Sequence, residues 1–397
     1  MLLLDPIVQN LAELQRIRRD IHAHPELCYE EERTSRVVVE KLTEWDIPVI
    51  TGMAGTGVVG VIRNGQSSRA VGLRADMDAL PMQEANAFAH ASVHQGKMHA
   101  CGHDGHTAML LGAAQYLARH RNFDGTVYLI FQPAEEGGGG AKRMMDDGLF
   151  QQCPMEAVFG MHNLPGAPVG TFGVKHGPMM ASSNQFQLRI QGKGAHAAQS
   201  HKAIDPITVA VQIAHAWQTV ITRNKDPLQP AVMSITQINA GSAFNVIPDE
   251  ANLRGTVRTF HPGVLDLIEH RMRVIAEHTA AAFGATAEFS FVRKYPSLIN
   301  HVQETELAIE VMRSIVGEER VDVRDEPTMG SEDFAFMLQE KPGCYVYIGN
   351  GNGDSRESGH GVGPCELHNP SYDFNDALLP IGATYWVRLA ERFLAQA

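Results

Sequence analysis

The sequence lacks the compositional features that would tie a protein to a membrane or to a nucleic acid. No apolar run approaches the ~20 residues of a membrane-spanning helix, and the opening segment MLLLDP is too short an apolar stretch for a signal peptide. The 33 Lys and Arg residues are outnumbered by 45 Asp and Glu, giving a net charge of −12, and they form no cluster that would bind phosphates. We therefore expect a cytoplasmic protein with neither a nucleic-acid nor a membrane partner.

Cysteine is also scarce, and its pattern argues against a disulfide framework. The five cysteines are odd in number and scattered over positions 28, 101, 153, 344 and 365. Disulfide-stabilised secreted domains instead carry paired cysteines, so we expect reduced thiols and a Cys101 that is free to bind a metal. What the chain does have is 397 residues of ordinary globular composition, 44% hydrophobic and 20% charged, enough for about two or three core-forming units.

Potential metal ligands are concentrated in residues 98–106, with the sequence MHACGHDGH. Three histidines and one cysteine within nine residues are the donor types that a borderline-soft divalent metal prefers. Chance clustering is the alternative, because the chain contains 19 histidines. However, the apolar run 108–118 that follows predicts a mostly buried helix, which a solvated surface loop would not need. We interpret the segment as the first half of a metal site.

Two acidic residues lie at the end of a predicted strand. Segments 55–62 and 70–79 are predicted as neighbouring strands, and the second contains Asp76 and Asp78. Residues two apart share a face of a strand, and the carboxyl ends of buried strands border the ligand crevice of an α/β sheet. The alternative is an acidic turn. We expect Asp78 to orient a metal-bound imidazole rather than to bind the metal itself.

The next two predicted strands also end in ligand-type residues. Strand 125–132 is followed by Glu135 and Glu136 and then by four glycines, and strand 157–163 contains His162 near its end. Adjacent glutamates cannot both point to one place, so one can bind a metal while the other faces the substrate. A lone histidine at a strand end is usually a satisfied polar group. Three successive strand ends with such residues favour a common site.

From residue 183 the predicted elements follow the order β-α-β-β-α-β, from a strand at 185–191 to a strand at 286–293. This is the ferredoxin-like arrangement, which can fold independently as an inserted segment. We therefore predict a catalytic domain formed by 1–182 and 296–397. The inserted lid or dimerisation domain is predicted to span 183–295.

Further polar candidates lie in the inserted segment and near the C-terminus. His196 is at the centre of a polar loop, Asn245 follows a Gly-Ser-Ala-Phe segment, and Arg258 lies on a predicted strand. Taken singly, each would be interpreted as a surface residue. His360 and His368 both qualify as one more metal ligand, and we favour His368 because His360 lies in a glycine-rich loop.

Six segments together resemble the hippurate hydrolase and N-acyl-amino-acid amidohydrolase family, which includes plant auxin-conjugate hydrolases. They are 73–81 (LRADMDALP), 98–106, 131–137 (FQPAEEG), 194–201, 244–248 (FNVIP) and 330–334 (GSEDF), in this order along nearly the whole chain. This family belongs to the two-metal aminoacylases and carboxypeptidases. The resemblance implies an α/β fold, with a three-layer zinc-peptidase-like catalytic domain and an inserted ferredoxin-like lid. The loop 350–366 departs from the family pattern and is a candidate determinant of substrate preference.

The resemblance also implies the residues of the site. The metal ligands would be Cys101, His103, Glu136, His162 and His368. They would hold two divalent ions per subunit, of Zn, Mn, Co or Ni, with Glu135 as the general base. The resemblance further implies a homodimer, or a dimer of dimers, that forms through the lid domain.

The predicted reaction is hydrolysis of the amide bond of an N-acyl amino acid, such as hippurate or an N-acetyl amino acid, to a carboxylic acid and a free amino acid. Two close divalent ions would acidify a bridging water and polarise the carbonyl, and Glu135 would accept the proton and pass it to the leaving amine. His196 and Asn245 would stabilise the oxyanion, and Arg258 would bind the substrate carboxylate.

Other functions fit the same pattern. One alternative is a dipeptidase, a carboxypeptidase or an N-acetyl-diaminopimelate deacetylase of the same wider group. The other is a protein that binds metal or conjugates without catalysis. That reading would be favoured by a missing base or a damaged ligand set, and the sequence shows neither.

Overall fold

The structure, a computed structural model, describes residues 1–353, 356 and 358–395. Residues 354, 355 and 357 of the 350–366 loop therefore lie outside the described residues. Contacts divide the chain into two compact units. The first contains Met1–Met179, Ile299–Glu326 and Asp333–Ala397, and the second contains Met180–Leu298 and Pro327–Glu332. Among the described residues, no helix is both long and apolar enough to span a membrane.

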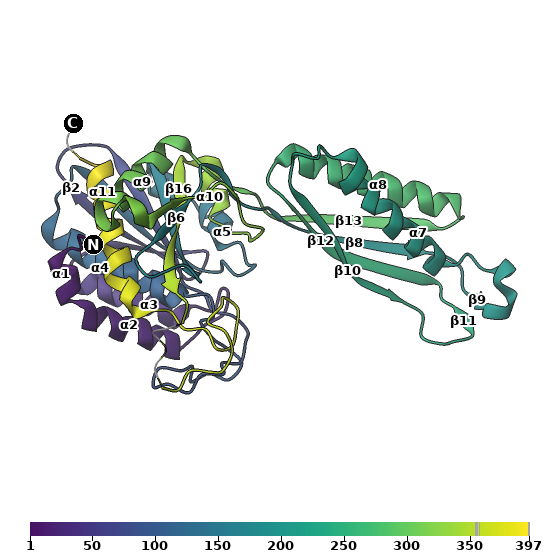
Figure 1. Cartoon of the computed structure of the whole chain (residues 1–397), viewed down its shortest axis with the longest axis horizontal. Helices are drawn as coiled ribbons and strands as arrows, with labels where there is room; N and C mark the ends of the chain where they lie inside the picture. Colours follow the sequence, from purple (N-terminus) through teal and green to yellow (C-terminus); the bar gives the residue numbers. More distant parts are fainter. Residues whose placement is uncertain (354–355, 357, 396–397) are drawn as a thin grey trace. The chain divides into compact units, whose positions relative to one another are not determined.

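The first unit is built on an eight-stranded sheet with the strand order β1-β2-β4-β3-β5-β16-β6-β15. Strands β2, β6 and β16 of this unit are labelled in Figure 1. Its strands are β1 (Val49–Met53), β2 (Gly57–Asn64), β3 (Ala70–Asp76), β4 (Gly125–Gln132), β5 (Ala157–Pro165), β6 (Phe172–Val174), β15 (Val321–Val323) and β16 (Gly343–Gly351). The four central strands β4, β3, β5 and β16 are parallel. Their carboxyl ends therefore meet at one edge of the sheet, where α/β proteins bind ligands.

Helices pack on this sheet and complete the core of the first unit. They are α1 (Asp5–Gln9), α2 (Leu11–Ala23), α3 (Glu32–Glu44), α4 (His103–His120), α5 (Gly140–Asp146), α6 (Leu149–Gln152), α9 (Val302–Val316), α10 (Ala335–Glu340) and α11 (Leu379–Phe393). Helix α4 contacts α2, α11 and strand β3, and its residues from 103 to 114 are all buried. Its residues from 108 to 114 are apolar on every side, and such a segment has to lie in the core, as the sequence predicts.

The second unit has the predicted β-α-β-β-α-β order. Its elements are β8 (Ser183–Gln191), α7 (Pro206–Thr219), β10 (Ala231–Ala240), β12 (Glu250–Thr259), α8 (Pro262–Ala282) and β13 (Thr286–Tyr295). The strands form an antiparallel sheet with the order β10-β12-β8-β13. Buried and exposed residues alternate along β8, because one face of the sheet packs on α7 and α8 around a core that includes Trp217.

Shorter elements complete the fold. β7 (Gly177–Met180) pairs with β14 (Leu298–Asn300), and β9 (Ala195–His196) pairs with β11 (Val246–Ile247). The α/β class with a ferredoxin-like second unit is confirmed. One detail of the sheet prediction was wrong: strands β2 and β3 are not neighbours, because β4 lies between them. The chain crosses from β3 through α4 to its parallel partner β4, and β2 pairs antiparallel with the far edge of β4.

Candidate metal centre

The segment that precedes α4 adopts a backbone conformation that requires glycine. Gly102 has φ +94° at the start of the helix, and a side chain there would collide with the amide of Asn163. The same amide donates to the carbonyl of Cys101 over 2.6 Å. The turn is thus fixed against the end of β5, with Cys101 and His103 on either side of the glycine.

The structure brings all five expected ligands together in the first unit. Three overlapping groups have donor atoms within 4.8 Å of one another: Cys101 with His103 and His162, Cys101 with Glu136 and His368, and His103 with Glu135 and Glu136. Cys101 Sγ lies 3.3 Å from His162 Nε2, and His368 Nε2 lies 3.1 Å from Glu136 Oε1. Shared members make this one continuous cluster, which is the arrangement that a dinuclear site needs.

The histidines of the cluster fit a bound cation. His103 is fully buried, and its Nε2 atom has no hydrogen-bond partner among the residues that the structure describes, a costly state unless a ligand binds there. Burial opposes the charged form of His103, yet the negative charges of Asp76 and Asp78 raise its pKa to about 10. The site therefore has an excess of negative potential, which favours a cation.

His162 is prepared to bind a metal in its neutral form. Burial lowers its pKa to about 3, and its Nδ1 atom lies 2.7 Å from the carbonyl of Asn163. This hydrogen bond places the ring proton on Nδ1 and leaves the lone pair on Nε2, next to Cys101. Burial, together with the negative charges of Glu136 and Glu135, raises the pKa of the Cys101 thiol.

Asp78 contacts both His103 and the loop that carries Glu135 and Glu136. Its backbone carbonyl accepts a hydrogen bond of 2.8 Å from His103 Nδ1. Its carboxylate accepts the backbone N–H groups of Glu135 and Glu136 at 3.0 and 2.9 Å. The sequence predicts only the contact to an imidazole. In the structure Asp78 also fixes the two glutamates, through amides that the sequence pattern does not reveal.

Other histidines near the cluster bind protein groups instead. His106 Nδ1 lies 2.6 Å from Asp76 Oδ1, and His106 Nε2 accepts the N–H of Asn163. His360 lies 3.2 Å from Asp373 Oδ2, so the structure places His368, and not His360, beside Glu136. His106 holds β3 and β5 against the first turn of α4.

The three candidates of the inserted segment all lie in the second unit. His196 is exposed on β9, next to Asn245, whose carbonyl accepts the N–H of Ala197 over 2.9 Å. Arg258 lies on β12 and donates to Ser331 Oγ over 2.9 Å. The structure thus places His196 and Asn245 side by side through their backbones and puts Arg258 on a different strand.

Sequence reasoning missed two buried carboxylates beside the glutamate pair. Asp333 accepts hydrogen bonds from Gln132 and Arg74 at 2.8 and 3.0 Å, and its N–H donates to Glu135 Oε1 over 3.4 Å. Glu31 is fully buried, and burial raises its pKa to about 7. Asp333 was visible in the GSEDF motif, but Glu31 was hidden in a run of three glutamates that reads as an ordinary helix start.

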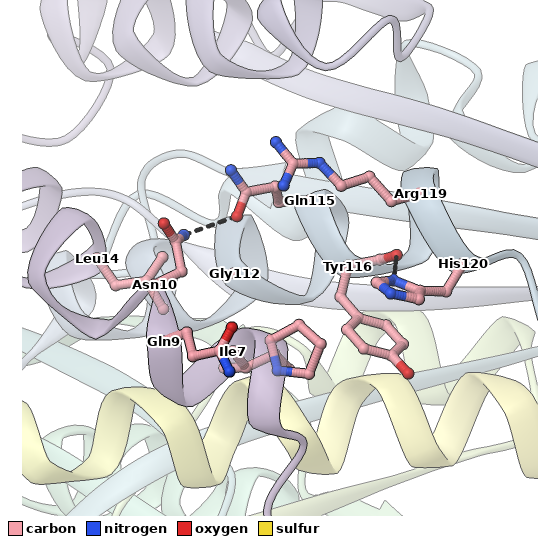
Figure 2. A pocket seen from close by; sticks show the side chains of 10 residues that line it. Ile7, Gln9, Asn10, Leu14, Gly112, Gln115, Tyr116, Arg119 and His120 are labelled. Carbon is pink, nitrogen blue, oxygen red and sulfur yellow. Dashed lines mark hydrogen bonds between the residues drawn. The ribbon is translucent and has the colours of Figure 1, made fainter.

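A separate pocket lies where α1, α2 and α4 meet (Figure 2). Asn10 Nδ2 donates to Gln115 Oε1 across it over 2.6 Å, and the ring of His120 stacks on Tyr116 at its edge. None of its lining residues belongs to the cluster around Cys101. This pocket is therefore distinct from the candidate metal centre.

Comparisons with known proteins show which proteins this chain is similar to. The profile of peptidase family M20/M25/M40 matches residues 72–392. A hippurate hydrolase of Campylobacter jejuni is 40% identical, with 99% of both chains covered. An N-acetylcysteine deacetylase of Bacillus subtilis is also 40% identical, over 94% of this chain and 95% of its own. A Bacillus subtilis structure described as a dinuclear metal-binding peptidase from the M20 family superposes with a TM-score of 0.83 at 36% identity, covering 98% of this chain and all of that one.

Proposed function

The chain belongs to peptidase family M20/M25/M40, and from that membership we propose that it is a metal-dependent amidohydrolase that cleaves N-acyl amino acids. The observation that supports this most directly is the cluster of Cys101, His103, Glu136, His162 and His368, in which Glu135 lies beside His103 and Glu136. Its sulfur, nitrogen and carboxylate donors suit borderline divalent metals such as Zn²⁺. The relatives named for hippurate and N-acetylcysteine hydrolysis support the substrate class.

Amide hydrolysis at this site would use two bound metal ions, Glu135 as the base and Asp78 as a backbone anchor. When bound, two divalent ions would lower the pKa of a water molecule and polarise the amide carbonyl. Glu135 lies within 4.8 Å of the donor atoms of His103 and Glu136, so its carboxylate can accept a proton from that water and deliver it to the departing amine nitrogen. Asp78 holds the backbone of Glu135 in place during both transfers.

The second unit supplies the remaining proposed roles. His196 and the neighbouring Asn245 would donate hydrogen bonds to the developing oxyanion, and Arg258 would bind the carboxylate of the substrate. The mobile-lid role of this unit and a homodimer formed through it remain proposals. In the described part of the chain, β10 and β13 are the edge strands of the sheet of this unit, and a second copy of the chain would cover such an edge.

A substrate panel tests the proposed function. We expect the purified protein, after loading with Zn²⁺, Mn²⁺, Co²⁺ or Ni²⁺, to hydrolyse hippurate or an N-acetyl amino acid with a kcat/KM at least ~10-fold above that for unblocked dipeptides. Release of free amino acid gives the rates. Faster cleavage of dipeptides or of N-acetyl-diaminopimelate would select the alternative enzymes, and metal binding without turnover of any compound would select a binding protein.

Cys101 provides a test of the ligand set. With metal bound, its thiolate is a ligand, and an alkylating reagent should not react with it. After chelation, we expect labelling of Cys101 to appear and to increase with pH, because burial and nearby carboxylates raise the pKa of this thiol. Half-buried Cys365 is the internal control, with equal labelling in both states by peptide mass spectrometry. Equal labelling of Cys101 in both states would remove it from the ligand set.

A further inference from the structure

A short segment next to the candidate site, residues 26–31, is attached to the strand end that carries Asp78. The N–H of Ala79 donates to the carbonyl of Glu26 over 2.8 Å, and Leu27 forms a bridge with Ala79. The segment then turns toward the loop 134–138, which contains Glu135 and Glu136. It thus lies between a fixed strand end and the loop of the proposed base.

Glu31 binds two backbone groups that are both in an unfavourable conformation. Its Oε1 atom accepts the N–H of Tyr29 and the N–H of Ala134, each over 2.9 Å. Tyr29 has φ +66° and Ala134 has φ +59°, and this left-handed region is strained for a residue with a side chain, because Cβ comes too close to the following carbonyl oxygen. Thr56 Oγ1 donates to Oε2 over 2.7 Å and fixes the carboxylate. Strained backbone conformations persist only where neighbouring groups stabilise them, and at Tyr29 and Ala134 the carboxylate of Glu31 does so.

The same segment also contacts the far end of the loop. The hydroxyl of Tyr29 donates to the carbonyl of Gly138 over 2.8 Å, and Cys28 Sγ packs so closely on Gly138 that a side chain there would collide with it. The loop is thus held at Ala134 by Glu31 and at Gly138 by Tyr29. Between these points Asp78 accepts the N–H groups of Glu135 and Glu136.

We propose that Glu31 is a positioning residue for Glu135. Glu31 holds the left-handed turn at Ala134, and this turn directs the carboxylate of Glu135 toward the metal cluster. The proposal rests on the proposed function only for the role of Glu135 as the base. Three successive backbone N–H groups, from 134 to 136, end on the carboxylates of Glu31 and Asp78. Removal of the first bond frees the residue directly before the base to return to an ordinary backbone conformation.

Two substitutions separate the reach of Glu31 from its charge. Glu31→Gln keeps the length and an Oε1 acceptor for both N–H groups. Its amide nitrogen can donate to Thr56 Oγ1, which reverses the direction of the wild-type bond. Glu31→Asp keeps the charge but withdraws the carboxylate by one methylene group. We expect Glu31→Asp to lower kcat by about 10- to 100-fold, since small misplacements of a catalytic group have effects of this size. KM should change by less than about 3-fold, and Glu31→Gln should stay within about 3-fold of wild type.

Hydrogen exchange provides a readout that does not depend on activity. In Glu31→Asp, peptides that cover 131–140 should exchange faster, while peptides of the second unit and the bound metal per chain stay unchanged. Glu32→Ala is the matched control, because this exposed acid is the next residue along the chain, and it should match wild type in both measurements. The positioning role would be overturned by faster hydrogen exchange in Glu31→Asp without a loss of kcat. It would also be overturned if Glu31→Gln and Glu31→Asp lost kcat equally.

The exchange result also distinguishes this proposal from the proposed function. If the wild-type chain hydrolyses no N-acyl amino acid, the proposed function fails. The rate of hydrogen exchange in peptides 131–140, compared between Glu31→Asp and wild type, still decides whether Glu31 holds the loop. If the wild type is active and both Glu31→Asp and Glu31→Ala keep its kcat, the proposed function stands and the positioning role is wrong.

Discussion

Glu135→Gln is expected to lower kcat by at least about 100-fold, the lower range for loss of a general base, while metal content stays at the wild-type value. The amide has the shape of the carboxylate but cannot accept the proton of a water molecule. Its backbone N–H still binds Asp78, so the loop should keep its conformation. Steady-state kinetics with the best substrate of the panel, together with elemental analysis for metal, measures both quantities.

The neighbouring glutamate is the matched control for this substitution. Glu136 has the same charge and contacts both Cys101 and His368 within the cluster. Glu136→Gln should therefore reduce the amount of bound metal, in contrast to Glu135→Gln, because a ligand is lost rather than a base. If Glu135→Gln loses metal as well, or keeps near-normal kcat, the base is another residue.

Mixing two inactive variants, Glu135→Ala and His196→Ala, is expected to restore activity. The two residues lie in different units of the chain, and we propose that His196 completes the site of a partner subunit when the lid closes. In a twofold-symmetric heterodimer, one of the two sites then has both groups intact. Random exchange of equal amounts should recover about a quarter of the sites, and purified heterodimers about half.

This experiment requires proof that subunits exchange. Two differently tagged wild-type populations, mixed under the same conditions and captured through one tag, provide that proof. A His196→Ala chain mixed with a chain that has both substitutions is the negative control, because no combination of these chains contains an intact pair. If exchange occurs and the mixture of single variants stays inactive, His196 acts within its own chain or has no catalytic role.

The sequence was most informative where chemistry depends on residue type and short spacing. Cys101 and His103 lie two apart around a glycine, and Glu135 follows a core strand, so the local pattern alone marked these residues as candidates. Their separate roles were implied by the family resemblance. The β-α-β-β-α-β order of the second unit followed from periodicity, because α7 and α8 cover one face of its sheet. The expected roles of these residues at the site remain predictions.

Long-range hydrogen bonds explain what the sequence did not reveal. Glu31 contacts Ala134 across 103 positions of the chain, and Asp333 contacts Gln132 across 201. Contacts between residues so far apart in the chain produce no helical or strand periodicity that could be recognised in the sequence. The position of β4 between β2 and β3 was missed for the same reason, since which strands pair depends on how α4 packs rather than on strand composition.

The order in which the strands of the first unit are synthesised affects how the nascent protein matures. Strand β5 has β3 on one side and β16 on the other, yet the whole second unit separates β5 from β16 along the chain. During translation, the edge of β5 therefore stays unpaired until β16 is synthesised, and an open apolar edge is prone to aggregation. The inserted unit has all its strands by then and can fold earlier. His368 also follows β16, and four of the five candidate ligands precede the insertion. Metal acquisition should then be one of the last steps of biogenesis, after the ribosome has released most of the chain.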